Sequence, residues 1–412
     1  MDILKIRDAR DVEAAVRAAI GDEQPLEIVG HGSKRAVGQP LATNAVLDLS
    51  PLNAVTAYEP NELIITVQAG APMADVLSLI DSRNQQFAFE PMNTAPLLGT
   101  PDVGSIGGMI AAGLAGPRRI KAGGARDHLL GAHAVSGFGD SFKAGGRVVK
   151  NVTGYDLCKL LAGSWGTLAV MTEVTLKVMP RAESERTLVL RGLDDLAANK
   201  AMTAALGSPY DVSGAAHLPG SALRATRGPL GEIAAPDQSA TLVRLEGITA
   251  SAAHRAKSLT AMLAAYGVCE IVEDGASAAL WSAIRDVAPF AASGPRSLWP
   301  VWRIVCPPAS GGTLGQAIAK GSQGEVIYDW AGGLIWAALP PSADAHATQL
   351  RKLVNAAGGH ATLIRADETV RRMVDVFHPQ QPGLAALGER VRHSFDPKRI
   401  LNRGRMARGP VA

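Results

Sequence analysis

The chain has few cysteines and few aromatic residues. Its three cysteines, Cys158, Cys269 and Cys306, lie far apart in the 412 residues and form no CxxC pair. This spacing excludes a disulfide framework, and it provides neither an iron–sulfur cluster nor a structural zinc site. Phe, Trp and Tyr together make up 4% of the residues, which argues against an aromatic surface for stacking nucleic-acid bases.

The sequence also lacks a long apolar run and a strong excess of charge. No stretch reaches the roughly 18 consecutive apolar residues of a membrane span, and residues 1–20 carry four acidic side chains, unlike a signal peptide. The formal net charge of +3 is spread along the chain, and the basic clusters are not interleaved with aromatics, which disfavours nucleic-acid binding. These features predict a cytoplasmic protein with no direct membrane span, whose membrane association would depend on a partner.

The first 180 residues predict an α+β domain. A helix is expected at residues 8–20, with Asp8 as its N-cap and Gly21 just past its end. A second helix is expected at residues 73–80, and strands are expected at residues 26–29, 45–49, 55–58, 63–67, 129–136 and 146–149 and within 167–179. Because the short strands occur in groups rather than in steady alternation with helices, the pattern is α+β. Pro180 ends the last run, and we place the end of the domain there.

Residues 181–375 predict a second α+β domain. Strand-like runs at residues 187–190, 241–245, 302–306, 326–329 and 333–338 alternate with alanine-rich helical stretches at 252–266 and 345–357. This pattern is typical of an antiparallel sheet with helices on one face. Residues 376–412 are expected to form a strap that returns to the first domain.

The first candidate binding element is the loop Gly30-His31-Gly32-Ser33-Lys34, which follows a predicted strand. Its small residues could point several backbone N–H groups at one anion, as a pyrophosphate site requires. A tight turn at the end of a strand is an equally good interpretation. The spacing is not GxGxxG, and Pro40 prevents an immediate helix, so a Rossmann site is disfavoured.

Two further elements have a glycine-rich or β-branched character. Gly104-Ser105-Ile106-Gly107-Gly108, running on to Gly113, offers a backbone-lined surface and a helix start that favours negative charge. Close helix packing would explain the same glycines. The third element runs from residue 149 to residue 173 and includes the Gly166-Thr167-Leu168-Ala169-Val170 segment.

In this order and at these separations, the three elements resemble the FAD domain of the vanillyl-alcohol oxidase superfamily, the FAD-linked oxidases with a PCMH-type domain. The resemblance implies a two-subdomain FAD-binding domain with an α+β antiparallel-sheet cap, divided here at residues 1–180, 181–375 and 376–412. In that family the first loop binds the FAD pyrophosphate, the second segment lies along the cofactor, and the third contacts the flavin through backbone. These roles fall on Gly30, His31, Gly32, Ser33, Lys34, Gly104, Ser105, Gly107, Gly108, Gly113 and Val170.

Several longer segments narrow the resemblance to the E-subunit family of bacterial glycolate oxidases. They are residues 107–119 (GGMIAAGLAGPRR), 328–333 (YDWAGG) and 358–362 (GGHAT). This resemblance implies an FAD-binding subunit that acts on a small 2-hydroxy acid beside a second flavoprotein subunit, with electrons passing to an iron–sulfur subunit. A self-sufficient FAD-dependent 2-hydroxy-acid oxidoreductase and a flavin-free scaffold subunit are the alternatives.

Two departures from the wider family refine these expectations. Members that attach FAD covalently have a histidine where this chain has Ser33, and His31 falls earlier, so we expect non-covalent FAD. The chain also has no HxGDGNxH metal segment, and no metal site is predicted. For 2-hydroxy-acid chemistry the candidates are Arg303, to hold a carboxylate, and His360, to accept a proton. A solvated or ion-paired arginine and a structural histidine are the simpler interpretations of these two residues.

Overall fold

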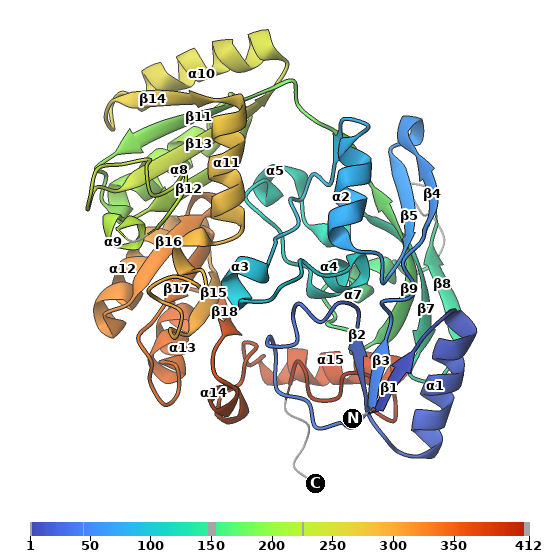
Figure 1. The fold of residues 1–412 in the computed structure, drawn as a ribbon. Coiled ribbons are helices and arrows are strands. Elements are labelled where there is room, and N and C mark those ends of the chain that lie inside the picture. Colours follow the sequence, from blue (N-terminus) through green and yellow to red (C-terminus); the bar gives the residue numbers. More distant parts are fainter. Residues whose placement is uncertain (1, 44, 147–153, 225, 408–412) are drawn as a thin grey trace.

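The computed structural model describes residues 2–43, 45–146, 154–224 and 226–407, and it confirms the α+β class. The chain forms two parts that lie side by side (Figure 1). The N-terminal part contains the elements from β1 to β10, and the central part contains those from β11 to α14. No helix within the described ranges has both the length and the apolar character needed to cross a bilayer.

A small parallel sheet begins the N-terminal part. Its strand order is β1-β3-β2, with bounds β1 Asp2–Lys5, β2 Leu26–Val29 and β3 Ala45–Asp48. Helix α1 (Ala9–Gly21) begins as predicted, because the Asp8 side chain accepts hydrogen bonds from the backbone N–H groups of Arg10 and Asp11. Its apolar face is buried.

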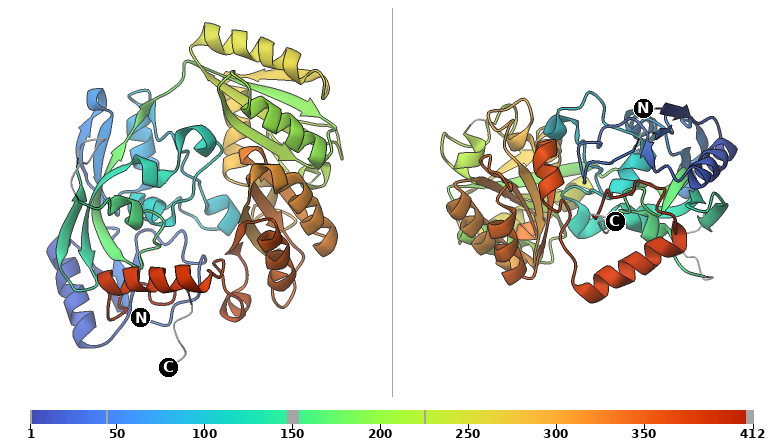
Figure 2. Two further views of the ribbon diagram at one scale, coloured as in Figure 1. Left: turned by 180° about the vertical axis from the view of Figure 1, so that it is seen from behind. Right: turned by 90° about the horizontal axis from the view of Figure 1, so that it is seen from below.

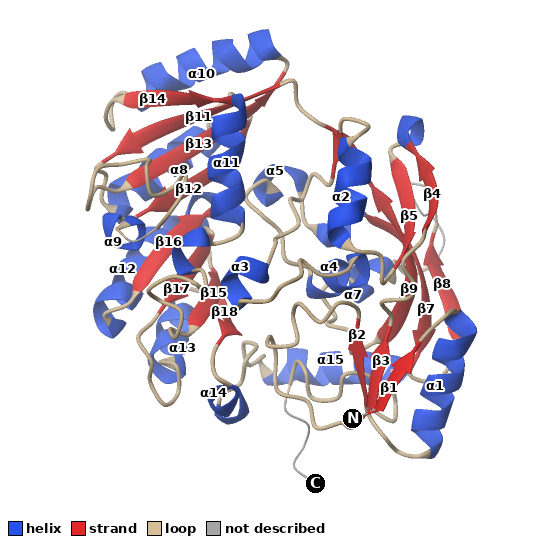
Figure 3. Ribbon diagram, in the orientation of Figure 1, coloured by secondary structure: helices blue, strands red, loops and turns tan. Residues whose placement is uncertain are grey.

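A five-stranded antiparallel sheet forms the larger layer of the N-terminal part, in the order β4-β5-β9-β7-β8 (Figure 3). Its strands are β4 Val55–Glu59, β5 Ile64–Gln68, β7 Leu129–Ser136, β8 Ser141–Gly145 and β9 Ala169–Lys177. The accompanying elements are α2 Met73–Asp81, α3 Ala95–Leu98, α4 Ile106–Ala112, α5 Arg119–Ala122, α6 Ala125–His128, α7 Cys158–Leu161 and the two-stranded pair β6 Gln85–Gln86 and β10 Met179–Pro180. The strand expected at residues 146–149 lies almost entirely outside the described residues.

The central part is built on an eight-stranded antiparallel sheet with the order β14-β11-β13-β12-β16-β17-β15-β18. Its strands are β11 Ser184–Arg191, β12 Val212–Leu218, β13 Ala240–Gly247, β14 Cys269–Glu273, β15 Val301–Val305, β16 Glu325–Asp329, β17 Leu334–Ala338 and β18 His360–Arg365. Its helices are α8 Asp195–Leu206, α9 Gly220–Leu223, α10 Thr249–Leu263, α11 Asp274–Arg285, α12 Gly311–Ser322, α13 Ala347–Ala356 and α14 Glu368–Met373.

The two faces of this sheet have different neighbours. Helices α8, α10, α12 and α13 cover the outer face, as Figure 2 shows from behind. Helix α11 lies on the inner face, where Trp281 joins a core that also contains Leu97 and Leu114 of the N-terminal part. The prediction of helices on one face is therefore correct for four long helices and wrong for α11, because the inner face also needs apolar cover where it meets the N-terminal part.

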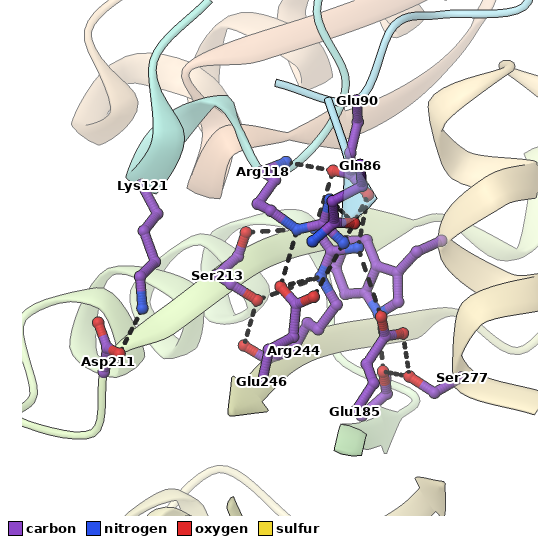
Figure 4. A network of polar contacts seen from close by, with 12 residues as sticks. Gln86, Glu90, Arg118, Lys121, Glu185, Asp211, Ser213, Arg244, Glu246 and Ser277 are labelled. Carbon is purple, nitrogen blue, oxygen red and sulfur yellow. Dashed lines mark hydrogen bonds and ion pairs between the residues drawn. The ribbon is translucent and has the colours of Figure 1, made fainter. Parts of the chain in front are cut away.

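A buried ionic cluster crosses the interface between the two parts (Figure 4). Glu90 and Arg118 come from the N-terminal part, and Arg244, Glu246 and Glu185 come from strands β13 and β11 of the central sheet. Arg118 donates to Glu246 from Nε at 2.9 Å and from Nη2 at 2.8 Å. The two parts are thus joined by directed ion pairs as well as by apolar packing.

The last helix, α15 (Pro382–Phe395), runs beneath the N-terminal part (Figure 2). Beyond it, Leu26 N–H donates to the Ile400 carbonyl at 2.8 Å and Asn402 N–H donates to the Leu26 carbonyl at 3.0 Å. The C-terminal segment thereby pairs with the free edge of β2, directly before the first glycine loop.

Candidate functional site

A pocket opens where β2 ends, and the first glycine loop forms one wall of it. Gly30, His31, Gly32, Ser33 and Lys34 all line this pocket. The backbone N–H groups of residues 31–34 donate to no acceptor in the part of the chain that the structure describes. Four consecutive free amides beside a pocket are the arrangement that holds a phosphate or another anion.

Side chains of the same loop are held firmly. His31 Nδ1 lies 2.9 Å from Asp102 Oδ2, and its Nε2 lies 3.0 Å from the Gly70 carbonyl oxygen. Lys34 Nζ donates to Ser33 Oγ at 3.2 Å. Burial lowers the pKa of Lys34 to about 8, against the opposing charge of Asp102. An anionic ligand beside Lys34 would therefore favour its charged form.

The second glycine segment packs directly against the first loop. A Cβ built on Gly30 would lie 2.2 Å from Ser105 Oγ, and one built on Gly104 would lie 2.3 Å from Ser33 Oγ. Gly104 also has a φ of +98°, which side-chain-bearing residues rarely adopt. The two segments therefore form one continuous cradle, and Ser105, Gly107 and Gly108 line the pocket beside the loop.

The start of α4 contributes to this cradle differently from the sequence-based expectation. Its first N–H groups were expected to attract negative charge. Instead Ile106 N–H donates to Ala71 at 2.9 Å, Gly107 N–H to Ala69 at 2.7 Å, and Gly108 N–H to Ser105 Oγ at 3.2 Å. These donors are used within the protein, so the free amides come from the first loop and α4 supplies a closely packed floor.

The remaining two predicted cofactor residues lie behind the pocket wall. Gly113 ends α4 with a φ of +63°, and a Cβ there would lie 3.2 Å from Gly163 Cα. Val170 is fully buried in the core beside α1. Its neighbours on β9, Ala169 and Met171, line the pocket, because alternate residues of a strand face opposite sides.

The C-terminal segment supplies pocket residues that the sequence analysis did not assign. Asn402 and Arg405 both line the pocket. Asn402 Oδ1 accepts from Ile28 N–H at 2.9 Å, and its Nδ2 donates to the Trp165 carbonyl at 2.7 Å. Arg405 Nη1 donates to the Val37 carbonyl at 2.9 Å. No motif in the sequence links these two residues to the first loop, because they are brought to it only by the pairing of the C-terminal segment with β2.

The free amides, the close contact of two glycine turns and the cationic Lys34 fit the diphosphate of a dinucleotide. No three His, Cys, Asp or Glu side chains among the described residues are grouped so that they could hold a metal ion. The chemistry of this pocket is therefore that of an anion-binding backbone cradle with an apolar floor.

The two predicted catalytic residues lie on the inner face of the central sheet, away from the glycine loops. Arg303 of β15 pairs with Thr362 of β18, and His360 pairs with Val305. Residues 303 and 305 share a face, so Arg303 and His360 are diagonal neighbours, a spacing within reach of long side chains. Arg303 Cζ lies 5.1 Å from the Trp330 ring centroid.

The charges around these two residues are mainly positive. Burial, then Arg119, lowers the pKa of Arg303 to about 10, opposed by Asp329. Burial, Arg303, His378 and Arg119 all lower the pKa of His360. His360 is consequently kept neutral near pH 7, and a neutral imidazole can accept a proton.

Comparison with known proteins relates the N-terminal part to FAD-binding domains. Residues 3–145 match the family model described as an FAD binding domain. The chain is 31% identical to the glycolate oxidase subunit GlcE of Escherichia coli (strain K12) over 394 residues, which is 95% of each chain. It is 31% identical to the glycolate oxidase subunit GlcD of Bacillus subtilis (strain 168) over 166 residues, 40% of this chain and 34% of that protein.

The structure of 4-ethylphenol oxidase from Gulosibacter chungangensis superimposes with a TM-score of 0.71 at 14% identity, covering 99% of this chain and 89% of that one. This likeness confirms the expected vanillyl-alcohol oxidase type of fold. The N-terminal match confirms FAD as the cofactor of this protein. Because the alignment with GlcE extends over nearly the whole of both chains, this protein belongs to the GlcE family of FAD-linked oxidoreductase subunits.

Proposed function

We propose that this chain is the FAD-binding subunit of a glycolate oxidase type complex that oxidises a small 2-hydroxy acid. The observation that carries the proposal is the set of residues 31–34, which line a pocket and whose N–H groups have no acceptor among the described residues, in a chain of the GlcE family. We further propose domain boundaries at residues 180 and 375, so that the central sheet acts as a cap and residues 376–412 as a strap.

In this proposal the central sheet binds the substrate. Arg303 holds the substrate carboxylate, because its planar guanidinium can pair with both carboxylate oxygens. His360 accepts the hydroxyl proton in its neutral form. Bound FAD supplies the electron acceptor for the oxidation of a hydroxy acid. The diagonal placement of Arg303 and His360 on one sheet face supports their joint action on one small molecule.

The proposed partners are a second flavoprotein subunit and an iron–sulfur subunit. The names of the relatives GlcE and GlcD describe each as a subunit of glycolate oxidase. Cys158, Cys269 and Cys306 are free and far apart in sequence, so this chain offers no set of thiolates for a cluster. We place the chain in the cytoplasm, with any membrane association arising through the complex.

The test is to purify the chain alone and together with the proposed second flavoprotein and iron–sulfur subunits. A yellow chain with close to equimolar FAD is expected, whereas a colourless chain that still assembles would identify a flavin-free scaffold. Glycolate should bleach the flavin, and electrons should pass on from the reduced flavin only in the assembled complex. Sustained turnover of glycolate by the isolated chain would instead favour a self-sufficient oxidoreductase.

A further inference from the structure

Four polar or charged residues gather on the inner face of the central sheet. Across four neighbouring strands, Asp329 pairs with Leu334, Leu334 with Val305, and Val305 with His360. Asp329 and His360 therefore lie in one row of the sheet. The next row on this face contains Arg303 and Thr362, which lie opposite each other. This face turns toward the N-terminal part, because Trp330 Nε1 donates to the Gly116 carbonyl at 3.1 Å.

Arg119 reaches the same place from the N-terminal part. Its guanidinium carbon lies 4.7 Å from the Trp330 ring centroid, and that of Arg303 lies 5.1 Å from it. The two arginines come from different parts of the molecule and share one aromatic ring. Trp330 itself follows β16 directly and is buried.

The guanidinium groups of Arg119 and Arg303 lack a paired anion among the described residues. Within these ranges neither side chain donates a hydrogen bond to a protein acceptor or forms an ion pair. The neighbouring Arg118 shows the contrast, because it is ion-paired with both Glu246 and Glu90. The protein therefore neutralises the charge of Arg118, whereas the guanidinium of Arg119 remains available to bind an anion.

The local electrostatics favour an anion. The charge of Arg119 acts on both Arg303 and His360, and Asp329 is the acidic group that opposes its effect on Arg303. Burial raises the pKa of Asp329 to about 7, so its negative charge is incomplete at neutral pH. Arg303 is partly buried and Arg119 is exposed. Two neighbouring cations repel each other, and an anion between or beside them would reduce that cost.

We propose that Arg119 is a second carboxylate-binding residue, which acts with Arg303 to hold a small organic acid at the interface between the two parts. This inference rests on the proposed function, since it places the substrate carboxylate in that same site. A ligand held by both arginines contacts both parts of the chain. Binding therefore stabilises the contact between them as well as orienting the ligand.

The experiment uses the purified FAD-loaded chain and oxalate, a small dicarboxylate that lacks an oxidisable hydroxyl. Calorimetric titration should give saturable binding, and oxalate should raise the melting temperature. Arg119→Gln should weaken oxalate binding about tenfold or more, the equivalent of about 1.4 kcal/mol, and should abolish the thermal shift. Arg119→Lys keeps the positive charge but loses the bidentate guanidinium. Its affinity for oxalate should lie between that of the unchanged chain and that of Arg119→Gln.

The matched control is Arg126→Gln, which removes an exposed arginine from α6 of the same part of the chain. It should bind oxalate as the unchanged chain does. The proposal is overturned if the unchanged chain shows no saturable oxalate binding, if Arg119→Gln binds as tightly as the unchanged chain, or if Arg126→Gln is weakened equally. Inorganic phosphate is titrated in parallel, and equal affinity for it would overturn the assignment to a carboxylate.

A failure of oxalate binding at Arg119 can be distinguished from a failure of the proposed function. FAD content is measured on every variant, and Arg119→Gln should retain its flavin because Arg119 does not line the glycine-loop pocket. If glycolate fails to reduce the flavin in the complex while Arg119-dependent oxalate binding persists, the carboxylate site stands and the choice of substrate is wrong.

Discussion

The carboxylate of Glu90 accepts a hydrogen bond from each terminal nitrogen of Arg244, at 2.8 Å from Nη1 and 2.9 Å from Nη2. The Arg244 side chain is 1% exposed and that of Glu90 is 10% exposed, so this bidentate pair is almost completely removed from water. It joins the N-terminal part to the central sheet. Loss of one partner would leave a buried charge without compensation.

Glu90→Gln should accordingly destabilise the protein by about 3 kcal/mol. The neutral amide can no longer balance Arg244 and Arg118. Urea unfolding followed by circular dichroism gives the free energy of unfolding. Glu368→Gln is the matched control, because the Glu368–Arg372 pair is more than half exposed and should contribute less than about 1 kcal/mol. If the two variants lost the same amount of unfolding free energy, the interfacial pair would contribute no more to stability than an exposed ion pair.

The cradle beside the pocket is tested by Gly104→Ala. The added methyl would sit 2.3 Å from Ser33 Oγ and 3.1 Å from Lys34 Nζ, at a φ of +98°. The backbone must shift, and FAD binding should weaken by about tenfold or more, since 1.4 kcal/mol of strain is sufficient for that factor. The ratio of flavin to protein absorbance measures retention. Gly275→Ala is the control, because a methyl added there has no neighbouring atom within 4 Å. Equal flavin loss in that control would show that the loss in Gly104→Ala does not come from crowding of the cradle.

Local signals allowed part of the fold and site to be predicted. Strands β2 and β7 begin and end where the sequence predicts, because each is a short, mostly apolar run followed directly by a glycine. Strand β12, in contrast, was not predicted. It is buried at every position and includes Ser213, Gly214 and Ala215, so it has neither alternation nor a β-branched run. A strand in the middle of a sheet between two cores needs no such pattern.

The residues of the site likewise divide into those that a local sequence signal predicts and those that only the fold brings together. The first loop could be predicted because one short segment contains its glycines. Asn402 could not be assigned to it, because its bond to Ile28 spans 374 residues of sequence. The different roles of Arg118 and Arg119 are also invisible in the sequence, since they depend on which residues the other part of the chain places opposite each side chain.

Non-covalent attachment of FAD is the third prediction. His31 is the histidine of the first loop, and both of its ring nitrogens are engaged, with Asp102 and with the Gly70 carbonyl. A nitrogen that is held in this way is not free to bond to the flavin. After acid precipitation, the flavin should remain in the supernatant and the pellet should be colourless. A yellow pellet would show a covalent bond and would require His31 or another nucleophile to leave its present contacts.

The buried carboxyl of Asp329 should make the stability of the protein depend on pH. Its Oδ1 accepts from Trp330 N–H at 2.7 Å, and its side chain is almost fully buried. Burial raises its pKa to about 7, with Glu90 adding to the effect and Trp330 N–H, Arg244 and Arg303 opposing it. An unfolded aspartate titrates near pH 3.9. Between these two values the folded state holds a proton that the unfolded state has lost, so the contribution of Asp329 to stability falls as pH rises through this window.

Asp329→Asn keeps the acceptor for Trp330 N–H and cannot ionise. The stability of this variant relative to the unchanged chain should therefore increase between pH 5 and pH 8, by at least about 1.4 kcal/mol, the equivalent of one pKa unit. Urea titrations at the two pH values measure this difference. Asp75→Asn, at an exposed position of α2, is the control and should show a difference that does not change with pH. A constant difference for Asp329→Asn as well would mean that the Asp329 carboxyl has the same charge at both pH values.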